Sequence, residues 1–140
     1  MRRKMAENLV NKGVMQGYLA YDGEQIVGWC NAADKISYRH LQEDEECVTD
    51  DCEEGKIKAV YCYDIAPAYR GTGIASKMLE KVCRDSEEEG YMYVEAYPFL
   101  DTDFAYPYHG TIGMYKRNGF VLYAERKWIT IMRKSLGVAR

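Results

Sequence analysis

The sequence predicts an α/β fold, a mixed sheet with flanking helices, and two observations lead to this class. Segments rich in β-branched and aromatic residues alternate with segments of helical period, in the order hairpin, strand, helix, strand, helix and two strands. The 140 residues, 47% of them apolar, suffice for one hydrophobic core but not for two. Residues 1–140 are therefore expected to form a single domain.

The N-terminal part is expected to begin with a helix and a hairpin. Residues 2–12 have the pattern of a helix end, and Gly13 suits the position after it. Strands at 14–21 and 24–32 flank Asp22-Gly23, a dipeptide that supplies the positive φ angles of a tight primed turn.

The middle of the chain is expected to hold a loop, a long strand and the main helix. Residues 33–56 have the composition of a loop, with one short helical turn near 37–42. Residues 57–66 are rich in β-branched and aromatic residues and stop at Pro67, which predicts a strand. Apolar residues then recur at helical spacing over 74–89.

The C-terminal part is expected to add three strands and one short helix. Turn-forming Pro98 and Asn118-Gly119 separate these elements. The strands are predicted at 91–97, 120–125 and 127–134, and the helix at 110–117.

Composition excludes several classes of protein. A net charge of −3 and a pI near 5.5 argue against a nucleic-acid binder. No stretch approaches the ~20 apolar residues of a membrane span, and the basic N-terminus lacks the apolar core of a secretory signal. Five cysteines without an export signal predict free thiols in a cytoplasmic protein. His40, Cys47 and Cys52 lack a fourth ligand, so no metal site is expected.

Charge is segregated along the chain. Residues 43–54, here called the acidic segment, contain eight acidic residues and no basic residue. Because the whole chain has a net charge of −3, the residues outside this segment have a net charge of +5. Such a segment forms either a solvated, mobile loop or a lip that attracts a cationic substrate. The positive remainder suits an anionic cofactor.

The junction between the strand at 57–66 and the main helix carries the clearest chemical signal. Two glycines let the backbone curl so that consecutive N–H groups point inward, and the helix N-terminus adds partial positive charge. Such a turn binds phosphate, although a plain strand–helix turn also uses glycines. The spacing fits neither a P-loop nor a dinucleotide fingerprint. The segment is Arg70-Gly71-Thr72-Gly73-Ile74-Ala75.

This segment resembles the acyl-CoA site of the GNAT superfamily of N-acetyltransferases, whose signature is Gln or Arg, two residues, Gly, one residue, then Gly or Ala. About 40 residues further on, a second segment resembles another hallmark of the family. It is Met114-Tyr115-Lys116-Arg117-Asn118-Gly119-Phe120. The closing segment, 128–134, is similar to the last strand of the family. The resemblance covers residues 14–136 and implies a GNAT-type, mostly antiparallel sheet with acetyl-CoA as cosubstrate.

The resemblance also implies roles for single residues. The main chain of Tyr63 and Ile65 would pair with the pantetheine arm of coenzyme A, and the Ile65 amide would face the thioester oxygen. Tyr115 stands where many members keep a tyrosine beside the sulfur, and is the expected proton donor to the thiolate. The phosphate-binding set would be Arg70, Gly71, Thr72, Gly73, Ile74 and Ala75.

The chain departs from the family pattern in two places. Tyr108 stands where many members have an asparagine that contacts the cofactor. Only about a dozen residues precede the hairpin, where the family usually has a strand and a helix, so an N-terminally shortened fold is expected. The hairpin would then be a sheet edge, which predicts a homodimer or an edge covered by residues 2–12.

Transfer to an amine also requires a base. An alkyl amine has a pKa of ~10.4, so about one molecule in 2,500 is uncharged at pH 7. Asp64 and Glu95 lie on the two strands expected to flank the thioester, and each is a candidate base, directly or through water, or an ordinary surface carboxylate. His40 is expected in a loop. His109 could reach the site from the entrance of the short helix, but a role in capping that helix or facing solvent is favoured.

The loop after residue 97 indicates the class of acceptor. Aromatic faces and carboxylates can hold an ammonium group, although the rings could instead cover the sheet. Together with the acidic segment they favour direct acetylation of a primary amine on a cationic small molecule. Two alternatives stay open, a non-catalytic acyl-CoA-binding sensor or interaction module, and a protein or peptide acetyltransferase. The loop residues are Tyr97, Phe99, Asp101, Asp103, Phe104, Tyr106 and Tyr108.

Overall fold

A single six-stranded sheet organises the computed structural model, which describes residues 17–100 and 108–137. Its order is β1-β2-β3-β4-β6-β5, and of the pairs it contains only β3–β4 is parallel. The predicted mixed, mostly antiparallel sheet is therefore confirmed. The strands are β1 (Gly17–Asp22), β2 (Gln25–Asp34), β3 (Ile57–Ile65), β4 (Tyr93–Ala96), β5 (Val121–Glu125) and β6 (Thr130–Ser135).

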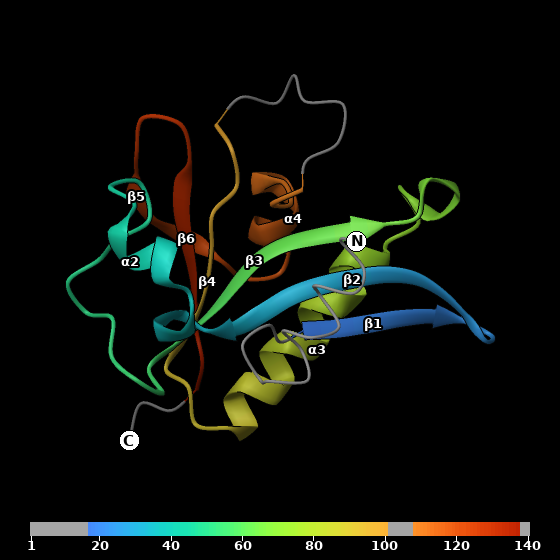
Figure 1. Ribbon diagram of the computed structural model, residues 1–140, viewed down its shortest axis with the longest axis horizontal. Helices are drawn as coiled ribbons and strands as arrows, with labels where there is room; N and C mark the ends of the chain where they lie inside the picture. The colour runs from blue at the N-terminus through green and yellow to red at the C-terminus, as the bar shows by residue number, and fades with distance from the viewer. Residues whose placement is uncertain (1–16, 101–107, 138–140) are drawn as a thin grey trace.

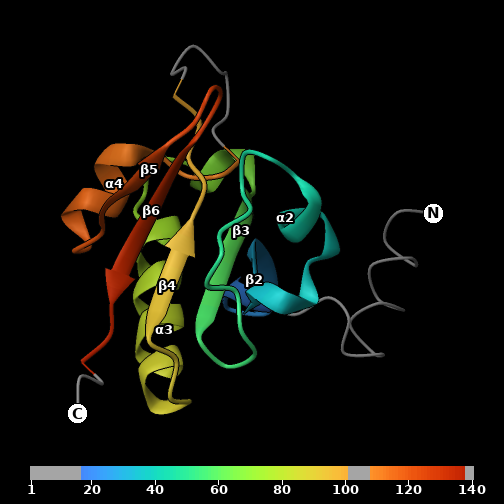
Figure 2. The same ribbon diagram turned by 90° about the vertical axis from the view of Figure 1, so that its left-hand side faces the viewer.

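Helices lie on both faces of the sheet, as Figure 2 shows. The main helix, α3 (Ile74–Glu88), packs Leu79 and Val82 into the core of one face. The short helix α2 (Arg39–Glu43) places Leu41 in a second core on the opposite face. Short 3-10 turns, η1 (Lys35–Ser37) and η2 (Pro67–Tyr69), precede α2 and α3, and α4 (Ile112–Arg117) follows the aromatic loop.

The hairpin forms where it was predicted, but its turn is one residue later. Asp22 pairs with Gln25, so the turn residues are Gly23 and Glu24, and Asp22 ends β1. Gly23 has a φ of +62° and is followed by a residue of negative φ, as in a type II′ turn with glycine first. The expected pair of positive φ angles over Asp22-Gly23 is wrong because Gly23 alone needs the left-handed region.

β3 separates from β4 at a bulge, and this separation positions the site. The pairing of β3 with β2 shifts between Asn31 and Ala32, which leaves Tyr61 as an extra residue on β3. The parallel pairing of β3 with β4 ends at Val60 and Ala96, directly before this bulge. Beyond that point the two strands diverge, and α4 lies at the open end (Figure 1).

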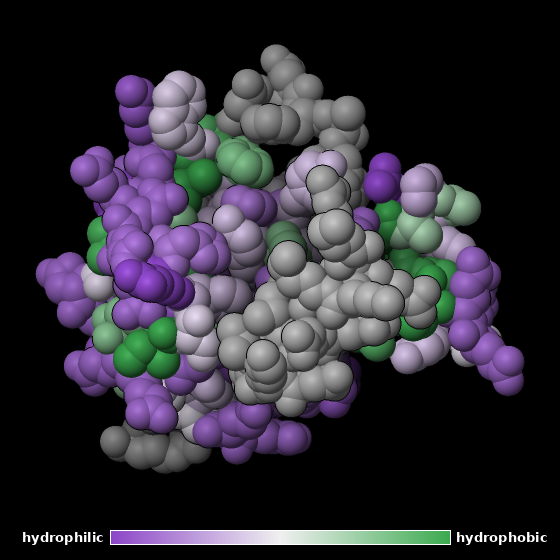
Figure 3. Space-filling model, in the orientation of Figure 1, coloured by the Kyte–Doolittle hydropathy of each residue, from purple (hydrophilic) through white to green (hydrophobic). Residues whose placement is uncertain are grey.

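The acidic segment is fixed to the sheet at two points. The Glu46 carboxylate accepts hydrogen bonds from the backbone N–H groups of Lys127 and Trp128, in the connection between β5 and β6. Asp51 accepts two hydrogen bonds of 2.8 Å from the guanidinium of Arg133 on β6. A freely mobile loop is therefore not what the structure shows here. Figure 3 shows hydrophilic surface over α2 and this segment, at the left of the view.

Both edge strands of the sheet expose apolar side chains. Within the described sheet β1 is an edge, as predicted, and its hairpin exposes Leu19, Tyr21 and Ile26. The predicted helix at 2–12 and the start of the predicted strand at 14–21 lie outside the described residues. None of the described helices is long and apolar enough to cross a membrane.

Candidate active site

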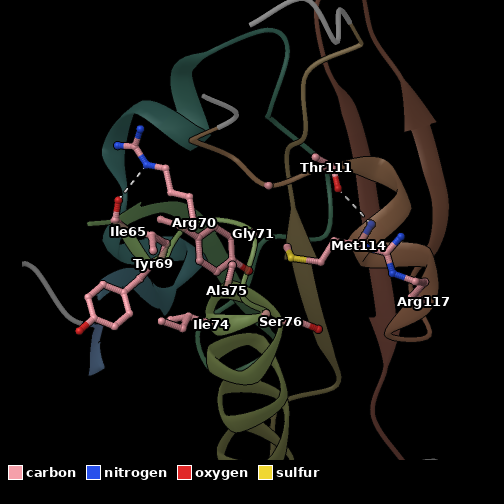
Figure 4. Close-up of a pocket in the computed structure, with 13 residues that line it drawn as sticks. Ile65, Tyr69, Arg70, Gly71, Ile74, Ala75, Ser76, Thr111, Met114 and Arg117 are labelled. Carbon is pink, nitrogen blue, oxygen red and sulfur yellow. Dashed lines mark hydrogen bonds between the residues drawn. The ribbon is translucent and has the colours of Figure 1, made fainter. Parts of the chain in front are cut away.

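A pocket of about 420 Å³ lies between the N-terminus of α3 and α4 (Figure 4). Seven of the eight residues expected to bind the cofactor line it, and Thr72 is the one that does not. Its lining residues are Tyr63, Ile65, Tyr69, Arg70, Gly71, Gly73, Ile74, Ala75, Ser76, Gly110, Thr111, Met114 and Arg117.

The glycine-rich turn lines this pocket and leads into the N-terminus of α3. Gly71 and Gly73 have φ angles of +77° and +85°, in the left-handed region that favours glycine. A Cβ at either position would meet no atom within 4 Å. Glycine is therefore favoured here by the backbone conformation and not by a lack of room for a side chain. The first amides of α3 have no acceptor within the helix, and the helix dipole makes them a site for an anion.

Arg70 and Thr72 hold this turn rather than point into the pocket. The Arg70 side chain turns back toward β3, where its Nε donates to the Ile65 carbonyl at 2.9 Å (Figure 4). The Thr72 hydroxyl donates to the Tyr69 carbonyl. Both side chains therefore stabilise the path of the backbone between β3 and α3.

The end of β3 presents the two main-chain positions expected to meet pantetheine. The Tyr63 amide donates to the Tyr108 carbonyl at 2.7 Å, so it points away from β2, toward the opening beside β4. Amides of alternate residues in a strand point to the same side, so the Ile65 amide faces that opening too. The Tyr63 contact means that the chain itself occupies one of the expected pantetheine positions.

Tyr115 lies behind the wall of the pocket. Its side chain is fully buried, and its hydroxyl donates to the His109 carbonyl at 2.8 Å and lies 3.3 Å from the Tyr63 hydroxyl. Burial raises the pKa of Tyr115, and the Tyr63 hydroxyl opposes that shift. At neutral pH the Tyr115 phenol therefore keeps its proton, as a proton donor must.

Glu95 does not have the position expected of a base. It is 0% exposed, and its two carboxylate oxygens pair at 2.6 Å with Lys35 and with Arg133. The Tyr97 hydroxyl donates to the same carboxylate at 2.7 Å. A carboxylate held by two cations inside the protein is a structural ion pair, so the structure contradicts its predicted role as a base.

Asp64 is exposed on the other side of β3 from Tyr63 and Ile65. It pairs across the sheet with Trp29 and lines a shallow groove of about 240 Å³ with residues of β2. The structure therefore leaves Asp64 accessible, but in a groove whose lining includes none of the residues of the cofactor pocket.

An aromatic group lies on the face of the sheet that α2 covers. The Tyr61 ring contacts His40 at a centroid distance of 4.7 Å and His109 at 5.0 Å, and His109 stacks on Phe99 at 4.4 Å. Sequence reasoning expected rings here but not the two histidines, because their neighbours are far away in the chain. The group consists of Tyr38, His40, Tyr61, Tyr97, Phe99 and His109. Asp101, Asp103, Phe104 and Tyr106 lie outside the described residues.

Several pocket residues on the α4 side were not predicted. A Cβ on Gly110 would lie 2.8 Å from the Met114 side chain and 2.9 Å from the Tyr115 hydroxyl, so this glycine is required by close packing. The Thr111 hydroxyl accepts from the Met114 amide and caps α4. Arg117, the second basic residue of the family-like segment, places a cation at the rim. The sequence of residues 110–117 predicts the short helix and its cap. It does not show that this segment folds beside α3.

Among the described residues, no group of three or more His, Cys, Asp and Glu side chains could hold a metal ion. All five cysteines are free thiols. The pocket is lined by the glycine-rich turn, by Ser76 and Thr111 and by Arg117, groups that suit a phosphate-bearing organic ligand.

Comparisons with known proteins agree with this geometry. Residues 15–122 match the model of the acetyltransferase (GNAT) domain. A crystal structure assigned to the GNAT family, from Desulfovibrio desulfuricans, superposes with a TM-score of 0.66 at 18% identity and covers 96% of this chain and 80% of the other. No curated protein sequence matches the chain.

Two further solved structures have the same fold. PaiA N-acetyltransferase from Thermoplasma acidophilum, in complex with coenzyme A, has a TM-score of 0.63 at 12% identity, with 96% of this chain and 70% of the other covered. The ribosomal-protein-S18-alanine N-acetyltransferase from Escherichia coli has a TM-score of 0.61 at 13% identity, with 96% and 78% covered.

Proposed function

Because the chain belongs to the GNAT family of acetyltransferases, we propose that it moves the acetyl group of acetyl-CoA directly to a primary amine of a cationic small molecule. The observation that carries the proposal is the pocket in which the glycine-rich turn and the N-terminus of α3 face α4. Its amides suit a pyrophosphate, and β3 leads from it to the aromatic group.

Coenzyme A would bind along this path from α3 to β3. The amides of residues 71–75 would hold the pyrophosphate, and Arg117 at the rim would meet a further phosphate. The pantetheine arm would replace the Tyr108 carbonyl as the partner of the Tyr63 amide. The Ile65 amide would then donate to the thioester oxygen, where negative charge develops during transfer.

Tyr115 would return a proton to the departing sulfur. Its phenol is protonated at neutral pH, because burial raises its pKa. The Tyr63 hydroxyl, at 3.3 Å, would stabilise the phenolate that remains, and Tyr63 itself lines the pocket. Tyr115→Phe is expected to lower kcat at least 100-fold, the range of about 10²–10⁴ that acid–base groups contribute, with little change in affinity for coenzyme A.

The surroundings of the aromatic group favour a cation as the acceptor. Burial raises the pKa of Tyr61, and the nearby Asp44 carboxylate adds to that shift, so negative charge lies within reach of the rings. Aromatic faces beside carboxylates attract an ammonium group more than a carboxylate or a methyl group.

Three amines of equal length test both the reaction and the charge of the acceptor. With acetyl-CoA, release of free thiol is expected to be fastest with 1,4-diaminobutane, slower with butylamine and slowest with 4-aminobutanoate. A preference for 4-aminobutanoate contradicts a cationic acceptor. Binding of coenzyme A without thiol release from any of the three, or from a lysine peptide, contradicts the enzymatic proposal and supports an acyl-CoA-binding module. Turnover of the peptide alone supports a protein acetyltransferase.

We also infer that the exposed edge of the sheet at β1 pairs in a homodimer. Leu19, Tyr21 and Ile26 expose about half of their surface on this hairpin (48%, 58% and 54%), and an edge strand with apolar side chains favours pairing. Light scattering at micromolar concentration is expected to give twice the chain mass of 16.2 kDa. The mass of one chain contradicts the dimer.

A further inference from the structure

His109 is held in a single tautomer by its contact with the end of β4. Its Nδ1 lies 2.8 Å from the Tyr97 carbonyl oxygen. A carbonyl can only accept a hydrogen bond, so Nδ1 carries the hydrogen and Nε2 of the neutral ring keeps its lone pair. Nε2 has no hydrogen-bond partner in residues 17–100 and 108–137, and no polar side-chain atom there is both buried and unpartnered. Nε2 is therefore reachable from outside.

The position of His109 connects the cofactor pocket with the aromatic group. Its carbonyl accepts the Tyr115 hydroxyl, and the next residue, Gly110, lines the pocket. Its imidazole points the other way, stacked on Phe99 and 5.0 Å from the Tyr61 ring. One residue thus contacts both the wall behind the expected sulfur and the expected acceptor site, where β3 and β4 diverge.

We propose that His109 is the base of the acetyl transfer, an inference that rests on the proposed function. The amine lone pair forms a bond to the thioester carbon, and the C–S bond breaks with its electron pair left on sulfur. The proton that the nitrogen must lose passes to Nε2 of His109, and sulfur takes a proton from Tyr115. The imidazolium and the phenolate then exchange protons with water. Because the acceptor amine is mostly in its ammonium form at pH 7, the overall reaction releases one proton to solvent.

Neither carboxylate considered from the sequence competes well for this role. Glu95 is neutralised by Lys35 and Arg133 inside the protein. Asp64 is accessible, but it lines a groove with Trp29 and other β2 residues, and none of the rings of the aromatic group lines that groove. His109 is the group with an available lone pair that touches both sides of the proposed reaction.

The surroundings of the ring keep it neutral. Burial lowers the pKa of His109, the hydrogen bond to Tyr97 opposes this, and the charge of a protonated His40 lowers it further. The titratable side chains near the ring, among the described residues, are His40 on α2, Tyr61 on β3 and Tyr97 after β4, with Tyr115 on α4 behind its carbonyl. A histidine whose pKa lies below the usual ~6.5 becomes protonated, and so stops acting as a base, only when the pH falls below ~6.5.

The pH dependence of kcat in the full chain tests this assignment. With 1,4-diaminobutane and acetyl-CoA both saturating, the wild-type kcat is expected to fall as pH drops below about 6.5. His109→Asn keeps a donor for the Tyr97 carbonyl but removes the base. It is expected to lower kcat by about 10²–10⁴-fold, to abolish the acidic limb and to leave the KM for acetyl-CoA unchanged.

Two matched variants and one spectrum separate the possible outcomes. His40→Asn is expected to keep the acidic limb and to move it to higher pH, because a protonated His40 lowers the pKa of His109. An acidic limb that persists in His109→Asn but disappears in Asp64→Asn overturns the proposal while the proposed function stands. Nitrogen-15 NMR of the wild type should show the Nδ1–H tautomer for His109, and an Nε2–H tautomer overturns the proposal even without turnover. No turnover by the wild type on any amine overturns both.

Discussion

Gly73 shows how one residue combines fold and function. It is the N-cap of α3 with a φ of +85°, and it lines the pocket. An L-residue in this conformation costs about 1–2 kcal/mol. The same positive φ occurs at Gly90, at the other end of α3, where a Cβ also meets no atom within 4 Å. The two glycines differ only in what their backbones face.

Gly73→Ala and Gly90→Ala form a matched pair. Each is expected to lower the free energy of unfolding by about 1–2 kcal/mol, measured in urea. Only Gly73→Ala is expected to weaken coenzyme A binding, by tenfold or more in calorimetric titration, because it displaces the amides that would hold the pyrophosphate. Equal affinities in the two variants would place the phosphates elsewhere.

At the scale of elements, the helices and strands that depend on local sequence were predicted well. Contacts between residues far apart in the chain were not. The β3–turn–α3 unit and the ends of α3 follow from the periodicity and glycines of one continuous segment. Glu95 was predicted as a base from its place on a strand expected to flank the thioester. Its ion pairs were missed because Lys35 and Arg133 are 60 and 38 residues away in the chain. For His109 a capping or solvent role was favoured over access to the site, since Tyr61 and Phe99 reach it only in the folded sheet.

The buried network around Glu95 fastens η1 and the acidic segment to β4 and β6. Lys35, 1% exposed, donates to Glu95, to the Cys47 carbonyl and to Thr49. Glu95→Gln leaves the buried Lys35 without a carboxylate partner and Arg133 with Asp51 alone. The variant is expected to lower the free energy of unfolding by about 3–5 kcal/mol. The control, Glu43→Gln, breaks the exposed pair with Arg39 and is expected to cost less than about 1 kcal/mol. Equal midpoints in urea would contradict the structural role of Glu95.

At the scale of the whole molecule, the sheet separates two chemical environments that meet at the end of β3. The glycine-rich turn and Arg117 line the pocket on the α3 side, and aromatic rings lie on the α2 side. The net charge of −3 thus reflects an acidic segment and a positive remainder that contains the pocket proposed to bind the pyrophosphate. Fixing the acidic segment to β6 through Asp51 keeps this division in place.

The Asp51–Arg133 contact makes the stability of the molecule sensitive to acid. Hydrogen bonds from Arg133 hold the pKa of Asp51 well below its usual range. A carboxylate whose pKa is lower in the folded than in the unfolded chain stabilises fully above about pH 4, and the contribution is lost as pH falls from there. Asp51→Asn is expected to lower the melting temperature at pH 7 and to reduce its fall between pH 4 and 2. An unchanged fall would assign acid sensitivity to other groups.

The most direct measurement is amide NMR of the full chain during titration with coenzyme A. The largest shifts are expected at the backbone amides of residues 71–75, with smaller ones at Tyr63, Ile65 and Arg117. Saturable binding with shifts concentrated at these amides would agree with a pyrophosphate at the N-terminus of α3. No saturable binding, or shifts confined to residues outside the pocket, would contradict it.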